Sequence, residues 1–172
     1  MIETSFKIED NLALQNGAFH KDIFNHWREI LHGRRYPNQR EFRPQKFPKY
    51  LPQIAIVSVS GVDEYDDRLT GDTVLEVLRL RQNHDRLVEP HDENVREVVR
   101  AMLNESALAG TPMYFKGKFQ PDGAKPIDFT ALVLPFSHND ETDILDTMML
   151  AFDFSKHDRI ELDFAAFAAD HA

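Results

Sequence analysis

The sequence lacks cysteine altogether, which excludes disulfide bonds, thiolate nucleophiles, thiolate metal ligands and flavin linked through cysteine. It also lacks any apolar run near the length of about 18 residues that a membrane-spanning helix needs. Its first ten residues, MIETSFKIED, are acidic and contain no apolar core of a secretory signal. We therefore expect a cytoplasmic protein with no membrane partner.

Positive charge is scarce, because 20 Lys and Arg residues face 29 Asp and Glu residues and leave a net charge of -9. Binding nucleic acid requires cations that neutralise phosphates, so we expect no nucleic-acid partner. The one basic stretch is at residues 34–53, where four prolines predict an irregular connector. We interpret it as a solvated loop that wraps the domain. The alternative is a surface for an acidic partner or a nucleotide, carried by Arg34, Arg35 and Arg40.

The chain of 172 residues, 42% of them apolar, suits one domain with a substantial core. Residues 1–17 are polar and end in Asn16-Gly17, which predicts a flexible N-terminal arm. Apolar residues at helical spacing predict helices at 19–33, 74–82, 92–110 and in a C-terminal tail at 156–172. In the third of these, Asp92 is expected to cap the first turn and Gly110 to end the helix.

Alternating apolar residues predict five strands, at residues 54–61, 64–71, 112–119, 126–136 and 146–154. Short turns join the first two strands to each other and the last three to one another. This order predicts an α+β fold with a five-stranded antiparallel sheet. The helices in the middle of the chain are expected to cover one face, and the N- and C-terminal helices to lie on the other face or at an edge.

Five motifs in this order carry a family resemblance: FNHWREILHGRRYP, FRPQKFPKYLPQIAIVSV, DRLTGDT, VLPFSHNDE and LAFDF. Together they resemble the atypical PAS proteins of alpha-proteobacteria, which are often single-domain chains. The resemblance covers about residues 19–155 and implies a PAS-like domain at 18–155. The sequence departs from the family after DRLTGDT, where VLEVLRLRQNHDRLVEP stands in place of an aromatic-Gly segment and a second Leu-Thr-Gly turn.

The resemblance implies a non-catalytic sensory or regulatory module that relays a signal through protein–protein contacts in trans. A small ligand would lie in an apolar pocket, since such pockets are mostly apolar. The sequence itself names no cofactor. The expected pocket residues are Arg68, Leu75, Leu78, Phe115, Phe129, Met148 and Phe152. The first alternative is a pure interaction or dimerisation module with a filled core, and the second is a small-ligand enzyme on the same scaffold.

The corner DRLTGDT has two interpretations. Arg68 could pair an anionic group of a ligand. Alternatively the corner is structural, and Gly71 supplies a backbone conformation closed to most residues. Thr70 and Asp72 would then cap the next helix, and Arg68 would pair with Asp67 or Glu76. We favour the structural interpretation, because the corner lacks the several glycines and the Lys of a phosphate loop.

Histidines suggest two further sites, neither of which we favour. His84 and His91, with Asp85, Asp92 and Glu93, could bind a metal ion, and one of the histidines could bind haem. Their spacing matches no standard ligand pattern, so we predict a solvated loop and no metal. His138 could act with Asp140 or Glu141 as an acid–base pair. The stretch SHNDET is more typical of a hairpin turn, so we predict no catalytic residues.

Apolar residues on the terminal helices suggest a partner surface. The residues concerned are Ile23, Trp27, Ile30, Phe164 and Phe167. PAS domains commonly dimerise through helices that flank the core, so the resemblance implies a homodimer in which Trp27 is an anchor. The alternative is that these residues cover the chain's own sheet.

Overall fold

A computed structural model describes residues 1–8, 18–78, 80–82, 88–90, 92–121, 123, 125–138 and 143–154. The predicted C-terminal helix at 156–172 lies outside the described residues, and so does most of the predicted arm. The histidines proposed as metal or haem ligands, His84 and His91, also lie outside them.

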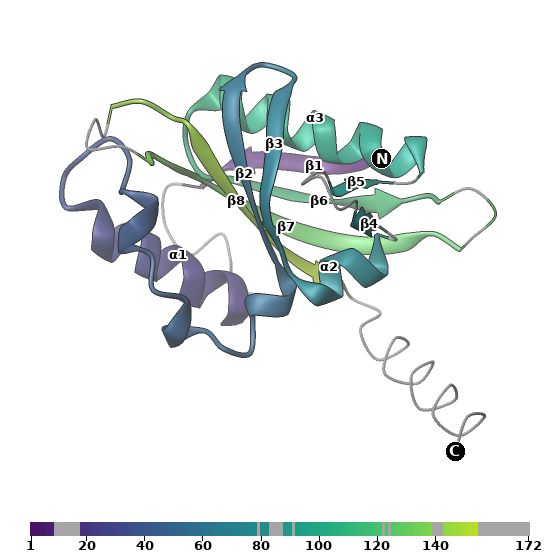
Figure 1. The fold of residues 1–172 in the computed structure, drawn as a ribbon, viewed down its shortest axis with the longest axis horizontal. Helices are drawn as coiled ribbons and strands as arrows, with labels where there is room; N and C mark the ends of the chain where they lie inside the picture. The colour runs from purple at the N-terminus through teal and green to yellow at the C-terminus, as the bar shows by residue number, and fades with distance from the viewer. Residues whose placement is uncertain are drawn as a thin grey trace.

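A six-stranded antiparallel sheet forms the centre of the fold, in the order β1-β6-β7-β8-β2-β3 (Figure 1). Its strands are β1 (Ile2–Lys7), β2 (Ile54–Gly61), β3 (Glu64–Thr70), β6 (Met113–Phe119), β7 (Ile127–Phe136) and β8 (Thr147–Phe154). The five predicted strands are confirmed, and with them the α+β antiparallel fold. A separate two-stranded ladder consists of β4 (Leu80–Gln82) and β5 (Val88–Pro90).

The sixth strand, β1, corrects the prediction that the first residues form a flexible arm. It pairs with the edge strand β6, and the Ser5 hydroxyl donates to Glu105 Oε1 at 2.7 Å. Gly117 allows the close approach, because a Cβ atom there would lie 2.3 Å from the Met1 carbonyl oxygen. The arm prediction failed because β1 is an edge strand with no fully buried side chain, so its sequence shows little apolar alternation.

Three helices are described: α1 (Ala18–Leu31), α2 (Asp72–Val77) and α3 (Glu93–Ala109). The predicted ends of α3 are confirmed. Asp92 accepts hydrogen bonds from the backbone N–H groups of Asn94 and Val95, and Gly110 adopts the left-handed conformation with φ of 62°. The prediction that the preceding helix continues to residue 82 is wrong, because the chain there pairs with β5 as β4. No helix among the described residues is long and apolar enough to cross a membrane.

Helix α3 contacts both edges of the sheet through neighbouring residues. Glu105 accepts the hydrogen bond from Ser5 of β1. Asn104 Nδ2 donates to Asp63 Oδ1 at 2.7 Å in the β2–β3 turn, and Asn104 Oδ1 accepts from the Tyr65 hydroxyl of β3. One turn of α3 therefore connects the first and last strands of the sheet.

Two apolar cores lie on opposite faces of the sheet, and we call them the α3-side core and the α1-side core. Alternate residues of β7, β8 and β2 point into one or the other. Helices α2 and α3 cover the first core. Helix α1 and residues 34–53 cover the second, as predicted for the N-terminal helix.

The proline-containing connector contributes to the core, so its interpretation as a solvated loop is wrong. It contains three short 3₁₀ helices, η2 (Gln39–Glu41), η3 (Pro44–Lys46) and η4 (Leu51–Gln53). Between these turns Phe42 and Phe47 are buried in the α1-side core. The prolines shape the turns that direct these two rings inward.

Candidate functional site: the α3-side core and the joint at Trp27

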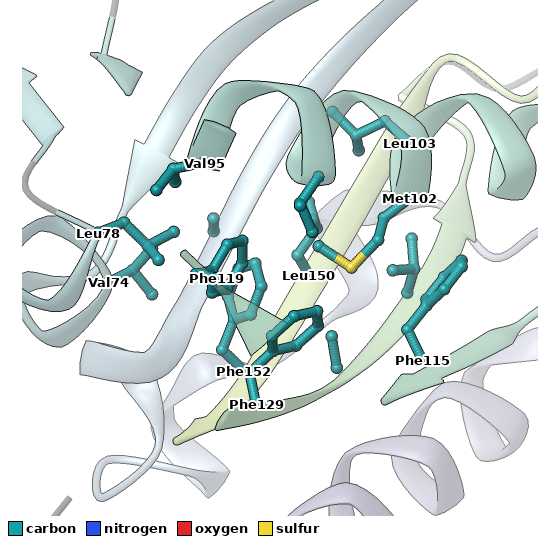
Figure 2. Packing of buried hydrophobic residues seen from close by; sticks show 14 of the residues in the cluster. Val74, Leu78, Val95, Met102, Leu103, Phe115, Phe119, Phe129, Leu150 and Phe152 are labelled. Atoms are coloured by element: carbon teal, nitrogen blue, oxygen red, sulfur yellow. The ribbon is translucent and has the colours of Figure 1, made fainter. Parts of the chain in front are cut away.

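Five of the seven predicted pocket residues lie together in the α3-side core between the sheet and helices α2 and α3 (Figure 2). They are Leu78, Phe115, Phe129, Met148 and Phe152, each at most 3% exposed. The other two do not join them. Leu75 is half-buried outside this cluster, and Arg68 is exposed on the edge strand β3.

Aromatic rings from three strands form the centre of this core. The Phe119 and Phe129 rings stack with centroids 4.3 Å apart, and Phe152 lies 6.2 Å from each of them. From α3, Met102 reaches the same cluster and is fully buried. Met102 was not among the predicted pocket residues, although the helical periodicity of the sequence placed it on an apolar face. Side chains of this kind suit a flat or aliphatic ligand.

One polar atom on the core-facing side of α3 has no hydrogen-bond partner among the described residues. It is the Ser106 hydroxyl, which is buried with 2% exposure and lies one turn beyond Met102. A buried hydroxyl without a partner costs free energy, so it is a natural contact for a polar group of a ligand. Sequence reasoning missed Ser106 because a single Ser on an apolar helix face gives no motif.

The corner DRLTGDT is structural, but not in the predicted way. The residue before α2 is Gly71, and no side chain caps that helix, so the predicted caps by Thr70 and Asp72 are wrong. The Thr70 hydroxyl instead donates to the Asp67 carboxylate. Burial raises the pKa of Asp67, and this hydrogen bond opposes the shift. Arg68 makes no hydrogen bond or ion pair with the described residues, so the expected pairing with Asp67 or Glu76 is absent there.

Gly71 is required because the backbone of η4 lies too close for a side chain, and not because of its own backbone angles. Its φ of -66° and ψ of 153° are open to any residue. A Cβ atom there would lie 2.3 Å from the Pro52 carbonyl oxygen and 2.5 Å from the Leu51 carbonyl oxygen. The corner therefore packs directly against η4. The Gly71 N–H also donates a hydrogen bond to the Ile54 carbonyl oxygen at 2.8 Å.

Three of the sequence motifs meet at one joint between α1 and the sheet. Trp27 Nε1 donates to the Pro135 carbonyl of β7 at 2.9 Å. Beside it, Gln39 N donates to the Ser137 carbonyl at 2.7 Å, and Ser137 N donates to the Pro37 carbonyl at 2.9 Å. Strand β6 pairs with β7 only as far as Val133. The backbone beyond Val133 can therefore form hydrogen bonds on that side with α1 and the connector instead. The Trp helix, the connector and VLPFS thus form one unit.

The joint corrects the predicted partner surface. Ile23 is fully buried and Trp27 is 6% exposed, and both pack in the α1-side core of their own chain. Ile30 is half-buried and packs against the same core. These residues cover the chain's own sheet, which was the alternative interpretation. Phe164 and Phe167 lie outside the described residues.

His138 belongs to a turn in this structure. Its backbone N–H donates to Asp146 Oδ1 at 2.6 Å, which closes the end of the β7–β8 hairpin. Its proposed partners Asp140 and Glu141 lie outside the described residues. Within the described part of the chain, no three His, Asp or Glu side chains are grouped as metal ligands.

We expect Trp27→Phe to lower the free energy of unfolding by about 1–3 kcal/mol, because the buried Pro135 carbonyl would lose its indole donor. Urea denaturation followed by circular dichroism measures the loss, since the variant has no Trp fluorescence. Ile23→Val, which removes one methylene from the same core, is the packing control and is expected to cost about 0.5–1.5 kcal/mol. A Trp27→Phe loss near zero would show that the indole does not anchor α1.

Comparison with known families adds one finding. The sequence model of a family described as PAS domain matches residues 17–150 of the chain. The match spans α1, the connector, most of both cores and the first half of β8. No curated protein matches the sequence.

Proposed function

Because the chain belongs to the PAS domain family, whose members are sensory and regulatory modules, we propose that it relays a signal through contacts with another protein in trans. PAS domains are generally non-catalytic, and the proposal requires no reaction. The observation that carries it is the sharing of strands β2, β7 and β8 by two separate apolar cores.

Alternation along β8 shows how one core can influence the other. Met148 and Leu150 pack in the α3-side core, whereas Met149 and Ala151 pack in the α1-side core. Protein interiors are close-packed, so a ligand or partner that displaces β8 on one face forces repacking on the other. Binding would thereby bias the position of α1 and the connector, which form the responding surface.

The input would be a small apolar ligand among the rings of the α3-side core, with the Ser106 hydroxyl as its polar contact. Support comes from the all-apolar side chains there and from the missing hydrogen bond of that hydroxyl. The alternative is a pure interaction module with a filled core. It is supported by the nearly complete burial of Phe115, Phe129 and Phe152 by the surrounding protein.

The partner we propose is a second copy of the chain. Since Ile23 and Trp27 are occupied by their own sheet, this contact rests on the sequence pattern of Phe164 and Phe167. Aromatic residues at helical spacing are typical anchors of a protein interface.

Native mass spectrometry of the purified full chain tests both proposals together. We expect a species of twice the chain mass that also carries a small-molecule adduct. The double variant Phe164→Ser/Phe167→Ser is expected to be monomeric, whereas Ser106→Ala should keep the dimer and weaken retention of the adduct. A monomer without adduct would contradict both the ligand and the dimer, and a dimer without adduct would favour the filled-core alternative.

A further inference from the structure

Two buried histidines of α1 make hydrogen bonds of opposite polarity. His20 Nε2 lies 3.0 Å from the Ala151 carbonyl oxygen of β8. A carbonyl only accepts, so His20 Nε2 carries a hydrogen. His26 Nε2 instead accepts from the backbone N–H of Arg43 at 3.1 Å, in the connector. That nitrogen must be bare, and the neutral His26 ring therefore carries its hydrogen on Nδ1.

An adjacent pair of aromatic rings and three charged groups surround His26. The ring is 4% exposed, and the Phe42 and Phe47 rings lie 5.1 Å and 5.4 Å from it. Glu29 Oε2 of α1 lies 3.7 Å from Nδ1, and Lys46 Nζ lies 3.9 Å from the same oxygen. With Arg43, these are the charged groups that face the imidazole from α1 and from the connector.

We propose that His26 is a proton-operated latch that holds connector residues 39–47 on α1. Protonation places a hydrogen on Nε2, so that it faces the Arg43 N–H as a second donor and the hydrogen bond is lost. The imidazolium would also be held against a pair of aromatic rings with only Glu29 to balance its charge. At His20 the same protonation leaves the bond to Ala151 intact, because Nε2 already donates.

The direction of the pH response follows from the closed structure. Burial lowers the pKa of His26, Lys46 lowers it further, and Glu29 opposes these effects. In the opened connector the residue returns to its ordinary pKa of about 6.5. The opened state therefore binds protons more readily than the closed state. The latch is fully closed well above pH 6.5, and the opened fraction rises by up to about tenfold per pH unit between that pH and the lowered closed-state pKa.

Opening would uncover part of the α1-side core. Phe42 lies edge-on to Phe136 of β7, with ring centroids 6.1 Å apart, and the neighbouring Gln39 N–H donates to the Ser137 carbonyl. Release of residues 39–47 therefore removes both a ring and a backbone pairing from the end of β7. The inference does not depend on the proposed signalling function, since it concerns only this contact.

The tautomers provide the first test, by ¹⁵N NMR of the imidazoles in the full chain. Near pH 7.5 we expect neutral His26 to carry its hydrogen on Nδ1 and neutral His20 to carry it on Nε2. A hydrogen on His26 Nε2 would overturn the latch, because that nitrogen could not then accept from Arg43. The measurement uses the unaltered protein, so it does not depend on a variant that folds.

Hydrogen exchange of the Arg43 amide, expressed as a protection factor, provides the second test. We expect this factor to fall by up to about fivefold from pH 6.5 to 5.5, with a smaller fall for the amides of β8. His26→Gln keeps an acceptor without a titrating ring and should remove the pH dependence. His20→Gln is the matched control and should retain it. An Arg43 protection factor that stays constant in the unaltered protein, or the same slope in His26→Gln, would overturn the proposal.

Discussion

Phe129→Ala is expected to lower the free energy of unfolding by about 3–5 kcal/mol, the range typical of a fully buried Phe. The Phe129 ring is 2% exposed, stacks on Phe119 and meets Phe152 edge-on, so its removal leaves a hole at the centre of the α3-side core. Chemical denaturation of the variant and of the unaltered protein, at the same pH, measures the difference.

Leu108→Ala on α3 is the control, since that side chain is 76% exposed and its removal should change stability by less than about 0.5 kcal/mol. The size of the Phe129→Ala loss also separates the rival functions. A closely packed core gives the full loss. A loss below about 1.5 kcal/mol would mean that the ring borders space reserved for a ligand, and it would contradict the filled-core alternative.

The second large effect is expected at the corner before α2. Gly71→Ala should lower the free energy of unfolding by about 3 kcal/mol or more, at the upper end of the range for overpacking. The new methyl group would meet two backbone carbonyl oxygens of η4, at 2.3 Å and 2.5 Å, and backbone atoms move less easily than side-chain ends. For a chain of this length the thermal midpoint should fall by at least about 6 °C.

Gly61→Ala is the matched control, at the other end of the same strand pair. A Cβ atom there would lie 3.4 Å from the flexible Glu64 carboxylate, so the neighbour can adjust. Ala has fewer conformations than Gly in the unfolded chain, which stabilises the folded state by about 0.4–1 kcal/mol. We therefore expect the free energy of unfolding to change little, in either direction. Equal stability of the Gly61 and Gly71 variants would show that the corner is not held against η4.

The elements that the sequence predicted well are those whose signal is local. Alternating side chains predicted β6, β7 and β8. Strands β7 and β8 bury one set of residues in each core, whereas β6 buries one set in the α3-side core and exposes Lys116 and Lys118 on its other face. The ends of α3 were predictable from Asp92 and Gly110, since a cap and a left-handed glycine act within one turn of chain. For the candidate site, the same alternation identified Phe115, Phe129 and Phe152 as neighbours.

The features that sequence reasoning missed depend on contacts between distant residues. Strand β1 forms because β6 offers an open edge with Gly117, which lies more than 100 residues away. The face of Trp27 was correctly predicted to be apolar, but its partner is the Pro135 carbonyl, and no helical pattern reports that. Gly71 was correctly predicted to be structural, but the predicted reason, a special backbone conformation, was wrong. The actual reason is its closeness to the backbone of η4, which the local sequence does not indicate.

The contacts of Asn104 and Glu105 with the two sheet edges have a geometric consequence. Strands lie about 4.8 Å apart, so the edges of a flat sheet of six would be about 24 Å apart. To bridge that span from two adjacent helix residues, whose Cα atoms are only about 3.8 Å apart, the side chains from α3 and from both edges would have to be fully extended. A sheet that curves into a trough around α3 brings both edges within easier reach, and the 6.2 Å between rings of the non-adjacent strands β6 and β8 agrees with such a curve. A change in the curvature of the sheet would move both of its edge strands relative to α3 at the same time. The curvature of the sheet is therefore one motion in which all six strands take part.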